Sequence, residues 1–262
     1  MINIKKAKQV FDEYVESYDM SNPMIKLKYN HTYRVCEQSI AICKSLGLNE
    51  EETNLAYLIA LLHDIGRFEQ EKLYHTFNDS KSTDHGDLGC HILFDEELIR
   101  RFVSDDVSDE IIKEAIWNHN KYKLDEGLDD RTLMHSKIIK DADKIDIIYN
   151  ATCLGEIKLN DDDSEISELV DEDFKNHVLV KHSHKRTKND SLLTMISFVF
   201  DLNFDYSFQY FKNENYINKY FDKLKNKNIF KKYIDIANDY VEGKCKDVRS
   251  KIFTSKSRRR EI

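Results

Sequence analysis

Glycine and proline are scarce in this chain: its 262 residues contain seven glycines and one proline. All-β folds with many tight turns need these residues at their corners, and collagen-like or linker-rich chains need still more of them. Charged residues make up 34% of the sequence and apolar residues 40%. Long amphipathic helices with one buried and one solvated face have this composition. The sequence therefore predicts an all-α protein.

The net charge and the cysteines restrict the setting of the protein. Asp and Glu outnumber Lys and Arg by 48 to 40, and the net charge of −8 gives no general attraction to phosphate backbones. The five cysteines form no C-x-x-C pair, which is typical of reduced thiols in a cytosolic protein. No apolar run reaches the roughly 18 residues of a membrane span. We expect a cytoplasmic protein with no membrane partner, disfavour a nucleic-acid partner and leave the oligomeric state open.

Apolar residues at spacings of three and four predict several helices. One runs from Met24 to Leu46, where Asn22-Pro23 marks its start and Gly47 its end. The next begins after Asn49 and is apolar almost all round at residues 55–62, which is typical of a buried helix. We expect this helix to continue to Gly66, and further helices at residues 3–17, 85–94, 106–118 and 131–150.

Other segments lack this pattern. Residues 67–84 are rich in Asn, Asp, Ser and Thr and predict a loop, and the strongly acidic residues 156–173 indicate a solvated or mobile excursion. Aromatic and aliphatic residues at 190–241 predict helices that close over the first half. We expect one continuous domain, with a helical part at 1–150 and an extension at 151–262 packed on it, ending in a disordered basic tip (Lys256 and Arg258–Arg260).

The most informative polar residues are His63 and Asp64, which follow eight apolar or aromatic residues at the end of the buried helix. A buried carboxylate is costly unless it is paired or bound to a metal. A lone histidine there would more often be a hydrogen-bonded core residue. An adjacent His-Asp pair is harder to explain in that way. His31 lies on the apolar stripe of the preceding helix, where a polar ring also needs a partner.

Three strings together resemble a known family: HTYRV at 31–35, LLHDIGR at 61–67 and ADK at 142–144. They are similar to the H…HD…D pattern of the HD-domain metal-dependent phosphohydrolase superfamily over roughly residues 25–150. The resemblance implies an HD-domain helical bundle that binds one or two divalent ions. Mixed nitrogen and oxygen ligands suit Mn²⁺, Fe²⁺, Co²⁺, Ni²⁺, Zn²⁺ or Mg²⁺. The implied ligands are His31, His63, Asp64 and Asp143.

Asp143 has a competitor in Asp141. The two lie about 200° apart on a helix, so they cannot both face one ion. Lys137 and Lys144 lie one turn to either side of Asp141, which indicates a solvated face with ion pairs. The family pattern matches Asp143, so we expect Asp143 to be the ligand.

Subfamilies with two metals add further histidines, and His85 and His119 come in the matching order. The resemblance implies that they bind a second ion and that Asp64 bridges the two ions; otherwise they are surface or capping residues. Arg67 follows the HD turn and Lys144 follows Asp143. Either could hold a phosphoryl oxygen, or instead form an ordinary ion pair.

These residues and the resemblance predict a metal-dependent phosphohydrolase with Asp64, Arg67 and Lys144 as catalytic residues. Its substrate would be a small compound with a phosphoester or phosphoanhydride bond, first of all a nucleotide. Two alternatives stay open. An HD-fold di-iron oxygenase uses a similar ligand set and would need O₂, and a nucleotide-binding module would bind without turnover.

Overall fold

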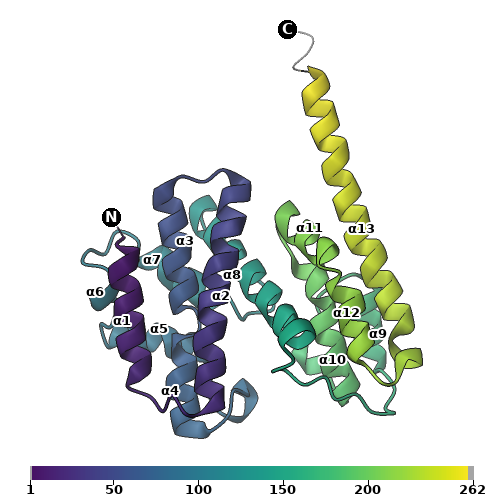
Figure 1. Cartoon of the computed structure of the whole chain (residues 1–262), viewed down its shortest axis with the longest axis horizontal. Coiled ribbons are helices and arrows are strands. Elements are labelled where there is room, and N and C mark those ends of the chain that lie inside the picture. Colours follow the sequence, from purple (N-terminus) through teal and green to yellow (C-terminus); the bar gives the residue numbers. More distant parts are fainter. Residues whose placement is uncertain (1, 259–262) are drawn as a thin grey trace. The chain divides into compact units, whose positions relative to one another are not determined.

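The computed structural model describes residues 2–258, with side chains for residues 2–246. It divides into two compact units, Met1–Asp146 and Ile147–Ile262, hereafter the first and second unit. Both are built from helices (Figure 1), and the described residues contain no strand, which confirms the all-α prediction. The division falls near the boundary expected at residue 150, and the packing of the second unit on the first stays a prediction. The side chains of the basic tip lie outside the described part.

Three helices form the frame of the first unit, and each begins after an asparagine whose side chain accepts a hydrogen bond from a nearby backbone N–H. Gly47 ends the second of them at φ 69°, a left-handed conformation that favours glycine. The third is buried from Leu55 to Leu62, as its composition predicted. These helices are α1 (Ile4–Glu16), α2 (Pro23–Leu46) and α3 (Glu50–Leu62).

The chain interrupts its helices at His63 and Asp64, and not at Gly66. Helix α3 ends just before this pair and α4 (Ile65–Tyr74) begins just after it. The expected loop at 67–84 is therefore wrong for residues 67–74. A Cβ on Gly66 would lie 2.4 Å from the carbonyl oxygen of His85, so this glycine permits a close approach between helices and does not end one.

The buried face of α4 explains why its periodicity was hidden. Phe68 is completely buried, as an apolar helix position should be, but the polar Gln70 is completely buried as well. A polar residue on the inner face removes the apolar spacing from which a helix is predicted. The first unit continues with α5 (His85–Cys90), a π-helical turn (His91–Asp95), α6 (Ile99–Phe102) and α7 (Asp109–Asn118). It ends within α8 (Asp130–Tyr149), whose last three residues belong to the second unit.

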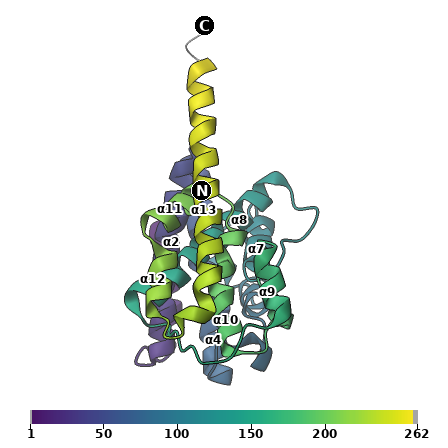
Figure 2. The same cartoon turned by 90° about the vertical axis from the view of Figure 1, so that its right-hand side faces the viewer.

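The second unit has an aromatic core, and its helices confirm the prediction for residues 190–241. Figure 2 shows α11 (Asp205–Asn213) and α12 (Tyr216–Lys223) alongside α13 (Lys227–Arg258), and all three pack together. The other α-helices of this unit are α9 (Glu168–Lys175) and α10 (Lys188–Ile196), and short π-helical or 3₁₀ turns lie at Asn150–Leu154, His182–His184 and Ser197–Asp201. No helix of the described residues is long and apolar enough to span a membrane.

The acidic segment is more ordered than a solvated excursion. Its last residues, 168–173, belong to α9. Asp161 accepts hydrogen bonds from the backbone N–H groups of Lys225 and Asn226, just before α13. Negative charge is favourable at the start of a helix, so the expectation of a purely solvated segment is wrong at these positions.

Candidate metal centre

The histidines and aspartates that the sequence singles out come together in the first unit. They come from α2, from the junction of α3 and α4, from the start of α5, from the end of α7 and from α8. All are buried except Asp143, whose side chain is 17% exposed. The residues are His31, His63, Asp64, His85, His119 and Asp143.

Asp64 lies between two pairs of imidazoles. Its Oδ2 atom is 3.4 Å from Nε2 of His31 and 3.3 Å from Nε2 of His63. Its Oδ1 atom is 3.5 Å from Nε2 of His85 and 3.8 Å from Nε2 of His119. Each oxygen of one carboxylate therefore faces its own pair of ring nitrogens.

Asp143 lies on the side of His31 and His63. Its Oδ1 atom is 3.0 Å from Nε2 of His31 and 3.7 Å from Nε2 of His63. The expectation that Asp141 lies on a solvated face is wrong, because Asp141 is completely buried. Helix α8 is buried nearly all round at this point, with Lys140 and Lys144 also buried, so flanking lysines do not mark a solvent side here.

Each of the four imidazoles is held through Nδ1, so that its Nε2 atom faces Asp64. Histidines that bind metals almost always donate their other ring nitrogen to a carboxylate or carbonyl, which fixes the tautomer and the ring orientation. Two of the acceptors are carboxylates and two are carbonyls one helical turn earlier. The pairs are His31–Asp146 (2.7 Å), His63–Ala60 (2.7 Å), His85–Asp79 (2.7 Å) and His119–Ile116 (2.6 Å).

The Nε2 atoms of these rings are placed where they could bind a divalent cation. The Nε2 atoms of His31 and His63 are buried and have no hydrogen-bond partner. Nε2 of His85 lies 2.9 Å from Nε2 of His119. Both of these rings donate through Nδ1, so in their neutral forms two lone pairs meet there, and a shared cation would remove their repulsion. Mixed imidazole and carboxylate donors suit Mn²⁺, Fe²⁺, Co²⁺, Ni²⁺ or Zn²⁺.

The surroundings set the charge of these groups. Burial opposes ionisation of Asp64, but Lys28 and His63 outweigh it and hold the pKa of Asp64 well below its usual range. Burial, together with the nearby Arg67, lowers the pKa of His85 to about 4. Burial opposes protonation of His31 and His63, but the nearby aspartates outweigh it and raise the pKa of His31 to about 10 and that of His63 above its usual value. Metals bind the ionised carboxylate and the neutral imidazole, so an ion beside His31 and His63 would displace protons from these rings.

Two cations approach Asp64 from its two sides. The ammonium of Lys28 donates to Oδ2 at 2.5 Å, and Nε of Arg67 lies 3.6 Å from Oδ1. Sequence reasoning missed Lys28, although its place three residues before His31 puts it on the ligand face of α2. Arg67 donates to Asp79 at 2.7 Å. This contact is the ordinary ion pair that was the alternative to a phosphoryl contact.

Lys144, which was predicted to contact the substrate, and Arg34 have other partners in this structure. The ammonium of Lys144 donates to the carbonyl of Lys140 on its own helix at 3.2 Å, and a role for it toward substrate stays a prediction. Arg34 donates to Asp146, the carboxylate that also accepts from Nδ1 of His31, so Arg34 contacts His31 only through this carboxylate. Asp146 and Asp79 were missed because no local pattern marks them: Asp146 contacts a ring 115 residues away, and Asp79 contacts a ring six residues further along the chain through the fold of a loop.

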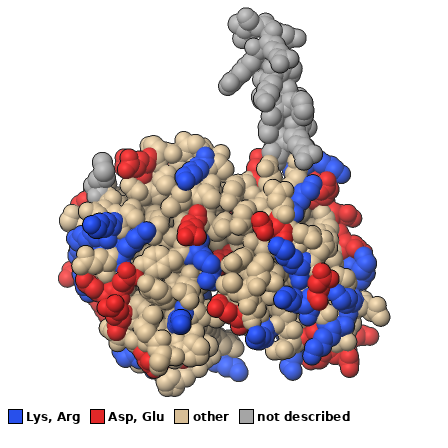
Figure 3. All heavy atoms as spheres, in the orientation of Figure 1, with Lys and Arg blue, Asp and Glu red and all other residues tan. Residues whose placement is uncertain are grey.

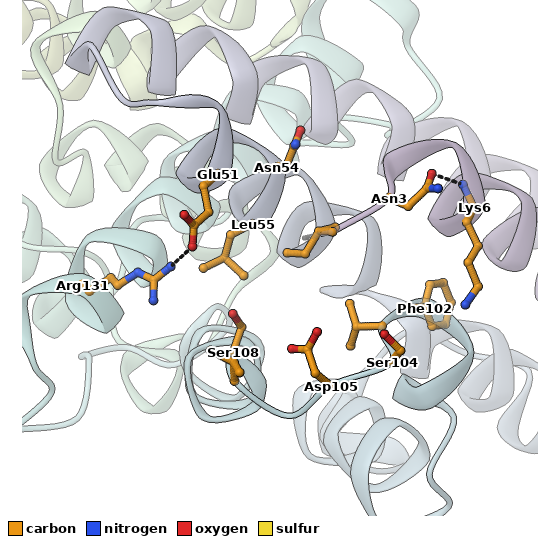
Figure 4. A pocket seen from close by; sticks show the side chains of 13 residues that line it. Asn3, Lys6, Glu51, Asn54, Leu55, Phe102, Ser104, Asp105, Ser108 and Arg131 are labelled. Carbon is orange, nitrogen blue, oxygen red and sulfur yellow. Dashed lines mark hydrogen bonds and ion pairs between the residues drawn. The ribbon is translucent and has the colours of Figure 1, made fainter.

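A separate cavity of about 240 Å³ in the first unit includes none of these residues. Figure 4 shows Lys6 and Arg131 at this cavity together with Glu51 and Asp105. Its charges are mixed, and it contains no histidine, so it adds nothing to the His/Asp cluster.

The family comparison agrees with this geometry. The family model of the HD domain matches residues 29–148, which include all six clustered residues. Residues 29–148 therefore match the HD domain, an all-helical fold that is typical of the metal-dependent phosphohydrolase superfamily. HD domains bind divalent metals, and the His/Asp cluster is compatible with such a site. Comparisons with curated proteins and with solved structures found no match.

Proposed function

We propose that the first unit uses two divalent ions to hydrolyse a phosphoester or phosphoanhydride bond of a small phosphorylated compound. The observation that carries this proposal is the position of Asp64, with one carboxylate oxygen toward each imidazole pair. Two-metal sites with ions about 3.5–4 Å apart clamp both the attacking and the leaving oxygen. The first ion would be held by His31, His63, Asp64 and Asp143, and the second by Asp64, His85 and His119.

Ions at these positions would supply Lewis-acid polarisation of a phosphoryl oxygen and a more acidic water. The side chains around them supply charge and orientation. Lys28 and Arg67 lie at opposite oxygens of Asp64, which gives one cation beside each imidazole pair. A guanidinium can bind two phosphoryl oxygens at once, whereas an ammonium acts as a point charge. We assign both residues to the anionic part of the substrate.

An aromatic ring beside these cations supports a nucleotide as substrate. The centroid of Phe77 lies 5.7 Å from the ammonium of Lys28 and 5.5 Å from the guanidinium carbon of Arg67. Bases stack on aromatic side chains, while the cations bind phosphate. Residues 1–146 carry 29 acidic against 19 basic side chains, and both signs are interspersed on the face in Figure 3. This surface favours a small substrate over a polymeric one.

A screen for phosphate release tests the proposal. Nucleotides, phosphomonoesters and dinucleoside polyphosphates are each incubated without O₂ and with each divalent metal in turn. Metal-dependent phosphate release is the expected result. Turnover that needs O₂ and an iron pair would contradict it in favour of an oxygenase. Tight nucleotide binding without any turnover would contradict it in favour of a binding module.

Arg67→Ala tests the assignment of the guanidinium to substrate. Because this side chain is only 12% exposed, we expect kcat/KM to fall by the equivalent of about 2–5 kcal/mol, with unchanged metal content. Lys72→Ala is the matched control, since that cation pairs with Glu69 on the same helix but is 61% exposed. If Arg67→Ala and Lys72→Ala have the same kcat/KM, Arg67 forms only a structural ion pair and does not contact the substrate.

A further inference from the structure

Two of the four imidazoles are backed by carboxylates, and each of these carboxylates also binds an arginine. Behind His31, Asp146 accepts from the ring Nδ1 at 2.7 Å and from Nε of Arg34 at 2.6 Å. This carboxylate lies on α8 and is only 2% exposed. Packing and an ion pair therefore hold the first ring within regular helices.

The corresponding carboxylate behind His85 lies in a loop. Oδ2 of Asp79 accepts from Nδ1 of His85 at 2.7 Å, and Oδ1 accepts from Arg67 at 2.7 Å. Asp79 opens a short 3₁₀ turn (Asp79–Lys81) between α4 and α5, and its side chain is 32% exposed. The second ring is thus held by a segment with far less packing around it.

One buried glutamine ties this loop to α4. The amide of Gln70 donates to Asp79 Oδ1 at 2.9 Å, to Ser82 Oγ at 2.8 Å and to the Thr83 carbonyl at 2.8 Å. Gln70 is completely buried. Arg67 also donates to the carbonyl of Phe77, the residue beside the two cations. The carboxylate of Asp79 therefore contacts His85, Arg67 and the loop anchor Gln70. It influences the orientation of His85, the position of Arg67 and the course of the loop.

We propose that Asp79 is the positioning residue that sets the affinity of the second ion, through His85, and that it holds Arg67 in place for the substrate. This inference rests on the proposed two-ion function. A carboxylate behind a metal-binding histidine raises the basicity of the ring and fixes its tautomer, and its loss typically costs about 10–100-fold in metal affinity. Because Asp79 lies in a loop and Asp146 in a helix, the second ion is the more weakly held of the two.

The test measures Mn²⁺ binding without substrate, by calorimetry and by the electron paramagnetic resonance of coupled Mn²⁺ pairs. The wild-type chain should bind two ions. Asp79→Asn should weaken the second ion by about 10–100-fold and leave the first unchanged. Asp146→Asn, the matched change behind His31, should instead weaken the first ion. Asp79→Glu keeps a carboxylate and should recover most of the affinity, which shows that the loss is not one of folding.

Ser82→Ala separates the carboxylate from the order of the loop, because it removes a loop anchor that does not touch His85. A second-ion affinity in Asp79→Asn equal to that of the wild type would overturn the proposal. So would an equal loss in Ser82→Ala, or a wild-type chain that binds one ion. If Asp79→Asn loses the second ion but the wild type releases no phosphate from any substrate, the positioning role stands and the proposed function falls.

Discussion

The two units bury different chemistry at their centres. The first surrounds Asp64 with imidazole rings and a lysine. The core of the second unit is built from aromatic rings. The ring centroids of Phe211 and Tyr216, for example, lie 5.5 Å apart. Burying rings stabilises a fold directly, whereas buried charges cost desolvation that their mutual attraction only partly offsets. The stability of the first unit should therefore depend on a bound cation, and that of the second should not.

The largest effect is expected at the shared carboxylate. Asp64→Ala should lose both ions, because each pair of imidazoles is left without its oxygen ligand, and phosphate release should cease with them. Elemental analysis of the purified variant measures this. Asp95→Ala is the control, because it removes an exposed carboxylate 2.8 Å from the ring of His91 and should keep full metal content. Full metal content in Asp64→Ala would remove the basis of the proposed site.

Removing the metal from the wild-type chain tests whether the stability of the first unit, and not that of the second, depends on a bound cation. The single tryptophan, Trp117, lies on α7, so its fluorescence reports on the first unit. An ion at 100 times its dissociation constant adds about 2.7 kcal/mol per site to the free energy of unfolding. EDTA should therefore lower the unfolding temperature seen by Trp117. Hydrogen exchange in α11 and α12 should stay unchanged.

A substitution in the aromatic core of the second unit should lower the stability of that unit and leave the metal content unchanged. Phe211 is almost completely buried, so Phe211→Ala should lower the free energy of unfolding of the second unit by about 3–5 kcal/mol. Hydrogen exchange in α11–α13 measures the loss, and Leu169→Ala, at a half-exposed position of the same unit, should change little. Metal content should stay at the wild-type value. A loss of metal in Phe211→Ala would show that the units do not keep separate stabilities.

Two glycines allow the same substitution in both units. Gly66→Ala puts a methyl group 2.4 Å from the His85 carbonyl oxygen and 2.7 Å from the backbone nitrogen of Gly89, so the start of α5 must shift. We expect a loss of about 1–3 kcal/mol and weaker binding of the second ion. Gly243→Ala, in α13, meets nothing within 4 Å and should stabilise the helix slightly. Thermal unfolding and Mn²⁺ titration compare the two; equal effects would contradict the close approach.

Three of the six clustered residues, His31, His63 and Asp64, were predictable because the pattern around them is local in the sequence, whereas Asp143, His85 and His119 came from the resemblance to the HD-domain superfamily. A His-Asp pair after a fully apolar run, and a histidine on an apolar stripe, can be recognised from the order of the residues alone. The same reasoning predicted α2 with its glycine stop and the buried α3. Each of these features depends on neighbours within one or two helical turns.

The carboxylates that hold two of the clustered histidines in place could not be predicted from local sequence patterns. Asp79 and Asp146 are ordinary aspartates in the sequence, and only the fold brings them to rings 6 and 115 residues away. Helix α4 was missed because its inner face carries Gln70. Asp141 was misplaced because Lys144 is buried with it and Lys137 is half-buried, so neither lysine marks a solvated face. In each case long-range packing overrides the local pattern.

The smallest effect is expected at a buried carboxylate of the second unit. Burial opposes ionisation of Asp190, but hydrogen bonds from Ser167 and from the N–H groups of Arg186 and Thr187 lower its pKa. A carboxyl with a lowered pKa stabilises the fold above its unfolded pKa of about 3.9, and this contribution is lost as the pH falls further. Asp190→Asn should therefore cost about 1–2 kcal/mol at pH 7 and less at pH 3. Denaturant unfolding at both pH values measures this, with the exposed Asp222→Asn as control. An equal loss at both pH values would mean that Asp190 acts through its shape and not its charge, so that the second unit, unlike the first, would draw no stability from a buried charge.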